Sequence, residues 1–222
     1  YRAMLAAPVL IARNLETLAR EIDAHAPARS PKIPVAVTEW GPFFQADTKG
    51  RFIDHNKTLG SAVFAASALK TFLESPRTEL ANIHTLNDYA MLGWIGPRNP
   101  VFPPKPEWAP TARYHALQLY TQHFGDRLVR SSTEAPTFDS KAVGMVDAVA
   151  GVPYVEAVGS LGSGGRTLHV IIINKHFDQP VDARISLRSF TPAREATAWS
   201  LTGSGIDAHT GTLPLQIPGA TW

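Results

Sequence analysis

A glutamate at the end of a short apolar run is the residue in this sequence best suited to chemistry. In "IPVAVTEWGPFF", residues 33 to 44, Glu39 follows a nearly continuous run of β-branched and small residues. Such a run is typical of a strand covered on both faces. A carboxylate buried there without a partner would be costly, so Glu39 is either a reactive group or a loop residue that caps a turn or pairs with a Lys or Arg.

Further side chains could contact a ligand near the same place. Trp40 and Trp94 could each stack on the apolar face of a sugar ring, although tryptophan packs into protein cores more often. His84 and Asn87 follow a second apolar run and could hydrogen-bond hydroxyl groups. Asp88 and Tyr89 come directly after them and could form the same kind of hydrogen bond. A single histidine such as His84, however, is more often structural than catalytic.

Composition excludes several other kinds of site. The chain has no cysteine, which rules out disulfides, thiolate chemistry and Cys-type zinc sites. Its eight histidines show no metal-ligand spacing, so we expect no metal and no cofactor. Net charge is only +2 with scattered Lys and Arg, which argues against a nucleic-acid partner. Because no apolar run reaches about 18 residues, we also expect no membrane span. The composition is compatible with secreted, periplasmic and cytoplasmic locations.

The first part of the chain, residues 1 to 125, reads as alternating helices and strands. Ile11, Leu15, Leu18 and Ile22 recur at helical spacing, and Pro8 suits a first helical turn. A strand over 33–39, a helix over 56–75 with Asn56 as its N-cap, and a strand over 80–86 follow. After a long loop over 87–110, a third helix is expected over 111–125. We place Gly125 at its C-cap.

The second part, residues 126 to 222, changes to short alternating segments divided by Gly, Pro, Ser and Asp. This pattern predicts an antiparallel β-sandwich. The segment "GSLGSGGRT", residues 159 to 167, lacks the Gly-Lys-Ser/Thr ending of a phosphate-binding loop and is read as a hairpin connection. The expected strands are "YVEAVGSL", "RTLHVIIINKH", "VDARISL" and "EATAWSL".

The helix and strand order of the first part accounts for about a quarter of a (β/α)8 barrel, which needs roughly 250 residues. The expected fold class is therefore α/β plus all-β, with the C-terminal part of a (β/α)8 barrel in residues 1–125 and a β-sandwich in 126–222. Two parallel strands alone would leave unpaired edges, so the chain is expected to be incomplete at its beginning.

The ordered series of motifs resembles the C-terminal portion of an α-L-arabinofuranosidase of glycoside hydrolase family 51, in clan A. The resemblance covers about residues 1 to 190, and it is clearest from 33 to 130. The segments that carry it are "VAVTEWG", "SAVFAASALKTFLESPRTELANIHTLND" and "YHALQLYTQHFGDRLV".

The resemblance implies a role for each matching residue. Glu39 would be the catalytic nucleophile and Trp40 would shape the sugar subsite. Thr85 falls near a position where typical members have a glutamine that touches the substrate, and the loop over 87–110 also departs from common members. The general acid/base glutamate of the family would precede Tyr1, so the resemblance implies a partner: the remaining barrel part or another chain. The end "LQIPGATW" lacks the final strand that would close the sandwich in the family, so the resemblance implies that this end is cut as well.

Two functional hypotheses follow. The first is a retaining glycosidase that acts on α-L-arabinofuranosides or related plant-polysaccharide glycosides, with Glu39 as nucleophile and its acid/base outside this chain. On this hypothesis, residues 1–222 alone are expected to be inactive. The alternative is a non-catalytic carbohydrate-binding or structural subunit of a split enzyme. Upstream sequence with an Asn-Glu pair at a strand end would favour the first.

Overall fold

The structure, a computed structural model, describes residues 1–29, 31–42, 54–87, 92–97, 108–209 and 217–221. Its first half alternates helices and strands, as expected. The order is α1 (Arg2–His25), β1 (Val35–Trp40), a 3-10 turn η1 (Asp54–Lys57), α2 (Leu59–Glu74), β2 (Thr78–Ile83), β3 (Ile95–Pro97), β4 (Trp108–Pro110) and α3 (Ala112–Gln122).

Strands dominate the second half. They are β5 (Arg127–Val129), β6 (Thr137–Ser140), β7 (Val149–Pro153), β8 (Val155–Leu161), β9 (Leu168–Asn174), β10 (Glu195–Ala198) and β11 (Ile217–Thr221), with a 3-10 turn η2 (Ser163–Gly165) between β8 and β9. The predicted hairpin over 159–167 is confirmed, since β8 and β9 pair antiparallel on either side of it. The strand predicted over "VDARISL" is wrong, because residues 181–187 have no regular structure.

The strands form small separate sheets within the described residues. β1 and β2 are parallel, whereas β3–β4, β5–β8–β9, β6–β7 and β10–β11 are antiparallel. None of these sheets closes on itself, so the expected mixture of α/β and β structure is confirmed while the barrel is not seen. The sandwich and the domain boundary at 125/126 stay predictions.

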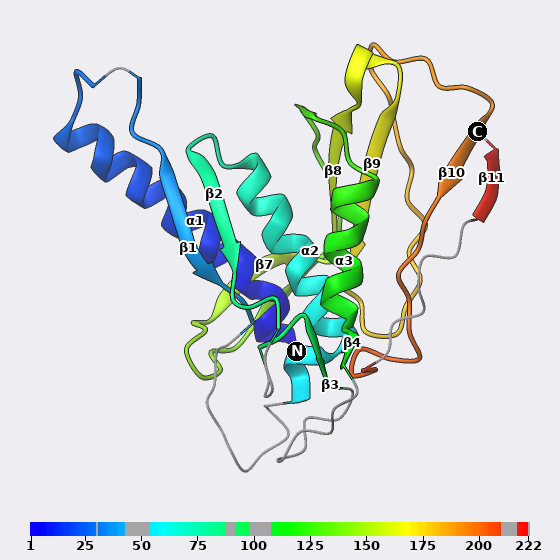
Figure 1. The fold of residues 1–222 in the computed structure, drawn as a ribbon, viewed down its shortest axis with the longest axis horizontal. Helices are drawn as coiled ribbons and strands as arrows, with labels where there is room; N and C mark the ends of the chain where they lie inside the picture. The colour runs from blue at the N-terminus through cyan, green and yellow to red at the C-terminus, as the bar shows by residue number, and fades with distance from the viewer. Residues whose placement is uncertain (30, 43–53, 88–91, 98–107, 210–216, 222) are drawn as a thin grey trace.

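One hydrophobic core connects the two halves of the chain. Trp40 of β1 and Phe64 of α2 belong to the same buried cluster as Phe138 of β6 and Val152 of β7. In Figure 1, α2 and α3 stand between the β1–β2 pair and the β8–β9 hairpin. Helix α2 contacts β2 on one side and both β8 and β9 on the other, so it is the element that links the parallel strands to the antiparallel sheet.

Three predicted helix features differ from the structure. Helix α1 begins at Arg2, so Pro8 lies in its second turn rather than its first. Thr58, not Asn56, caps α2: its side chain accepts a hydrogen bond from the Ser61 backbone N–H, while Asn56 lies in η1. Helix α3 ends at Gln122 with His123 as its C-cap, and Gly125 lies beyond the helix.

Gly125 is required by a close approach rather than by a helix end. A β-carbon at this position would lie 2.3 Å from the backbone of Leu161 at the end of β8. The Gly125 N–H also donates to the Ser160 hydroxyl at 2.7 Å. The glycine therefore lets the chain that leaves α3 pack directly against the tip of the hairpin.

Among the helices that the structure describes, none is long and apolar enough to cross a membrane.

Candidate functional site

Glu39 lies at the carboxyl end of β1, next to the end of the parallel strand β2. It is exposed, and the following residue, Trp40, is buried and pairs with Ile83 of β2. The His84 N–H donates to the Trp40 carbonyl at 2.9 Å, which extends the pairing past the end of β2. A β-carbon on Gly41 would lie 3.0 Å from the His84 carbonyl oxygen, so the glycine keeps the two strand ends close together.

A cavity of about 340 Å³ adjoins this strand end. Its volume is at the lower end of the range for small-molecule sites. Helices α1 and α2 supply apolar walls, and β1 supplies Glu39 and Trp40. Among the described residues of the lining, Glu39 is the single carboxylate. The residues that line it are Ile11, Asn14, Leu15, Leu18, Val37, Glu39, Trp40, Gly41, Phe64 and Phe72.

Trp40 and Trp94 are brought together, but inside the protein. Trp94 is fully buried and Trp40 is 7% exposed. Their ring centroids lie 5.5 Å apart with the planes at 88°, an edge-to-face arrangement. Both indole Nε1 atoms are buried without a hydrogen-bond partner in the described part of the chain. The two indole rings therefore pack in the core next to the ends of β1 and β2. A role for either tryptophan in binding sugar stays a prediction.

The remaining predicted residues follow β2. His84 and Asn87 are exposed, and Asn87 forms an isolated bridge with Ile95 of β3. Thr85 connects this segment to Trp94, whose N–H donates to the Thr85 carbonyl at 3.0 Å. The predicted Asp88 and Tyr89 lie outside the described residues. The hydrogen bond from the His84 N–H to the Trp40 carbonyl thus places His84 beside Glu39, at the carboxyl ends of β1 and β2.

Sequence reasoning missed two residues at the start of α3 that hold Trp94 in place. Thr111 donates through both its N–H and its hydroxyl to the Trp94 carbonyl, at 2.9 and 2.8 Å. Arg113 is fully buried, donates to the Leu92 and Gly93 carbonyls at 3.0 Å each, and places its guanidinium 5.5 Å from the Trp94 ring. An arginine within a helical pattern gives no sign of such a role, although the full burial of a guanidinium is unusual.

His55 is a third residue that the sequence did not single out. It is buried in η1, and its Nε2 lies 3.1 Å from the carbonyl oxygen of Pro42, two residues after Trp40. The contact ties the segment after β1 to the segment before α2. No motif indicated it, because a histidine in a loop carries no spacing signal.

The arrangement offers one carboxylate held at a strand end, with apolar walls and buried indoles around it. Such a group can act as a nucleophile or as one of two acid/base groups. No group of three metal-binding side chains occurs among the residues that the structure describes. A reaction that needs two carboxyl groups would need the second from outside the cavity lining.

Comparisons with known proteins point to one family. The sequence profile of the family described as "Alpha-L-arabinofuranosidase C-terminal domain" matches residues 38–213. No protein with a curated description matches the chain. Several solved structures share its fold at low sequence identity.

Three of these structures are glycosidases from bacteria. The thermostable family 51 α-L-arabinofuranosidase from Thermotoga petrophila superposes with a TM-score of 0.79 at 22% sequence identity. The match covers 97% of this chain and 45% of the Thermotoga petrophila chain. The α-L-arabinofuranosidase from Thermotoga maritima, in complex with arabinose, gives 0.75 at 22% identity, over 92% and 41%. The family 51 arabinofuranosidase from Xanthomonas axonopodis pv. citri gives 0.62 at 17%, over 99% and 42%. This chain spans less than half the length of each.

Proposed function

Because the chain belongs to the α-L-arabinofuranosidase C-terminal domain family, we propose that it forms part of a retaining glycoside hydrolase with Glu39 as the nucleophile. The observation that carries the proposal is the position of Glu39 at the carboxyl end of β1, beside the end of the parallel strand β2. Catalytic groups of (β/α)8 enzymes occupy this end of their strands. We propose α-L-arabinofuranosides or related plant-polysaccharide glycosides as substrates.

In the proposed mechanism, a Glu39 oxygen attacks the anomeric carbon of the sugar while the bond to the leaving oxygen breaks. A second carboxylic acid donates its proton to that leaving oxygen. The resulting glycosyl ester on Glu39 is then attacked by water, which the same second group deprotonates, and Glu39 is released as a carboxylate. Retaining enzymes hold the two carboxyl groups about 5 to 5.5 Å apart.

The second carboxyl group is proposed to come from the rest of a (β/α)8 barrel, in the same polypeptide or in a partner chain. Support comes from the cavity: the part of its lining that the structure describes contains no carboxylate besides Glu39. The exposed Leu80 on β2 and Leu86 just beyond it also favour further packing at this edge. Residues 1–222 alone are therefore expected to hydrolyse no glycoside.

The proposal is tested by comparing Glu39→Gln with Glu79→Gln in a protein that combines residues 1–222 with the rest of the barrel. Glu79 is an exposed glutamate on the neighbouring strand β2 and serves as the matched control. We expect Glu39→Gln to lose at least about a thousandfold in kcat on an aryl arabinofuranoside. Glu79→Gln should keep the wild-type rate. Equal rates for both variants would refute the role of Glu39 and favour a non-catalytic binding or structural chain.

A further inference from the structure

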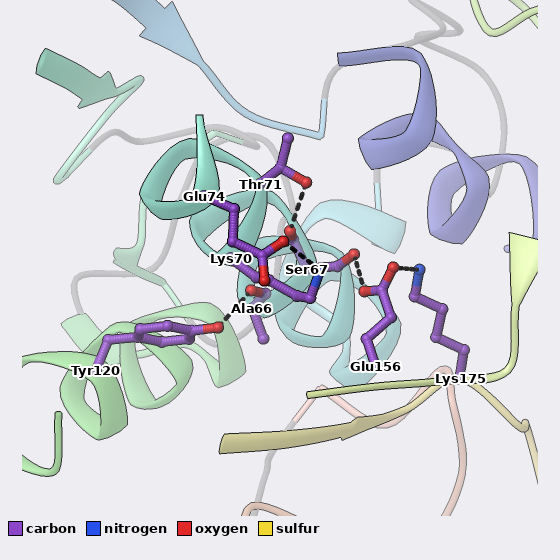
Figure 2. A network of polar contacts seen from close by, with 8 residues as sticks. All are labelled: Ala66, Ser67, Lys70, Thr71, Glu74, Tyr120, Glu156 and Lys175. Carbon is purple, nitrogen blue, oxygen red and sulfur yellow. Dashed lines mark hydrogen bonds and ion pairs between the residues drawn. The ribbon is translucent and has the colours of Figure 1, made fainter. Parts of the chain in front are cut away.

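A buried polar network joins α2 to strands that are far away in the sequence. The Ser67 hydroxyl donates to Glu156 Oε2 at 2.6 Å, and Lys175 Nζ lies 3.0 Å from Glu156 Oε1. Figure 2 shows Glu156 reaching from β8 between the helix and Lys175, with one carboxylate oxygen toward each partner. Ser67 and Lys175 are fully buried and Glu156 is 9% exposed. The carboxylate is therefore the central member of the network.

Joining two elements through buried charged groups requires a large desolvation free energy. Removing a carboxylate and an ammonium from water carries a large desolvation penalty, and well-packed apolar residues often stabilise such positions equally well. Burial lowers the pKa of Lys175, and the charge of Glu156 opposes that shift. A directional contact, unlike an apolar one, fixes how the two elements are positioned relative to each other.

Two phenylalanines of α2 contact the tryptophan at the candidate site. Phe72 contacts Trp40 edge-on with ring centroids 5.2 Å apart, and Phe64 contacts it at 6.5 Å. Phe72 is five residues after Ser67, so these two side chains leave the helix on different sides, whereas Phe64, three residues before Ser67, lies on the same side as the serine. Helix α2 thus lies between the Glu156 network and the tryptophan that follows Glu39 in the sequence.

We propose that Glu156 is a positioning residue: through Ser67 it fixes α2, and through Phe72 and Phe64 it holds Trp40, and thus Glu39, in place. This inference rests on the proposed function of Glu39. It assigns the strands after residue 126 a part in the reaction, namely to brace the strand that carries the nucleophile. If the contact served stability alone, its removal would lower the free energy of unfolding without moving Trp40.

The first experiment uses enzyme kinetics to distinguish an effect on the position of Glu39 from an effect on stability. It uses the protein that combines residues 1–222 with the rest of the barrel. Glu156→Gln leaves the Lys175 ammonium without its counter-charge, whereas the double change Glu156→Leu with Lys175→Met replaces the pair by apolar side chains. We expect the double variant to keep its melting temperature within a few degrees. Its kcat should fall by about tenfold, with KM changed less than twofold, because a small displacement of a catalytic group slows the chemical step. A double variant with wild-type stability and wild-type kcat would overturn the proposal.

The control is the ion pair between Lys70 and Glu74 on the same helix. Lys70 Nζ lies 2.6 Å from Glu74 Oε2, and both side chains are partly exposed. The double change Lys70→Met with Glu74→Gln removes charges from α2 without touching Ser67. We expect its kcat and KM to equal those of the wild type. A tenfold loss of kcat in this control would mean that any charge change on α2 slows the reaction, which would also contradict the proposal.

The second experiment monitors the surroundings of Trp40 directly and does not depend on enzyme activity. The protein is labelled with 5-fluorotryptophan, and the ¹⁹F signal of Trp40 is assigned with Trp40→Phe. We expect Glu156→Gln and the apolar double variant to shift or broaden that signal, while the Lys70/Glu74 control leaves it in place. If Glu39→Gln keeps full activity, the proposed function fails, and this signal alone decides whether Glu156 braces Trp40. An unchanged Trp40 signal in both Glu156 variants would refute the brace.

Discussion

Trp94 meets Trp40 edge to face directly beneath the end of β1, with ring centroids 5.5 Å apart. Trp94 is fully buried, and its backbone is held by Thr85 and Thr111. Trp94→Ala would leave a cavity under the strand end and should lower the free energy of unfolding by about 3–5 kcal/mol. Denaturant unfolding followed by circular dichroism measures the change.

Trp199 provides the control for that prediction. It is 37% exposed and stacks on His123 with centroids 3.7 Å apart, away from the Trp40 cluster. Trp199→Ala should cost clearly less than Trp94→Ala, because 37% of Trp199 is already exposed and its removal gives up less buried apolar area. Equal losses for the two substitutions would contradict the view that Trp94 supports the strand end.

A side chain at position 125 should be poorly tolerated. Gly125→Ala would place a β-carbon 2.3 Å from the Leu161 backbone, which must move to make room. We expect a loss of about 1–3 kcal/mol in the free energy of unfolding, as for other overpacked sites. Gly162→Ala is the matched control, since its β-carbon would meet its nearest neighbour at an ordinary 3.5 Å. The stability of both variants is measured by thermal unfolding. A larger loss of stability for Gly162→Ala than for Gly125→Ala would contradict the view that Gly125 is required by its close approach to Leu161.

The ion pairs of Asp23 should make stability depend on pH in acid. Hydrogen bonds from Arg77, and then from Lys32, lower the pKa of Asp23 below its ordinary value of 3.8. The folded state then binds fewer protons than the unfolded state between the two pKa values. The stabilisation is fully present well above pH 3.8 and is lost as the pH falls through the lowered pKa of the folded state.

Asp23→Asn tests this dependence against Glu16→Gln, an exposed position on the same helix. The melting temperature of Asp23→Asn should lie below that of the wild type at neutral pH. The gap should shrink as the pH is lowered past 3.8. Glu16→Gln should follow the wild type throughout. A gap for Asp23→Asn that stays constant over the whole range would contradict the assignment.

Periodicity predicted the element order well because each element carries its own pattern. The apolar run before Glu39 and the alternation in β8 and β9 are local signals, and each appears in the structure. Cap and turn positions were harder to predict. Asn56 and Thr58 are both good N-caps, and which one caps α2 depends on η1, which the sequence pattern did not indicate.

The surroundings of the site could be predicted only in part. The motif placed Glu39 at a strand end, and the structure puts it there beside β2. The sequence leaves both packing and sugar stacking open for Trp40, because tryptophan serves either role. Only the tertiary contacts with Phe64, Phe72 and Trp94 bury it. The Glu156–Ser67 contact spans 89 residues, and no short-range pattern can reveal such a pairing.

The most direct measurement of the central claim is the rescue of Glu39→Ala by azide in the barrel-containing protein. Without a nucleophile the variant should hydrolyse an aryl arabinofuranoside at least about a thousandfold more slowly than the wild type. Added azide can occupy the vacated space and attack the anomeric carbon from the same side. The account predicts a partial return of aryl release and a glycosyl azide of inverted configuration. Near-wild-type turnover of Glu39→Ala without azide would contradict it.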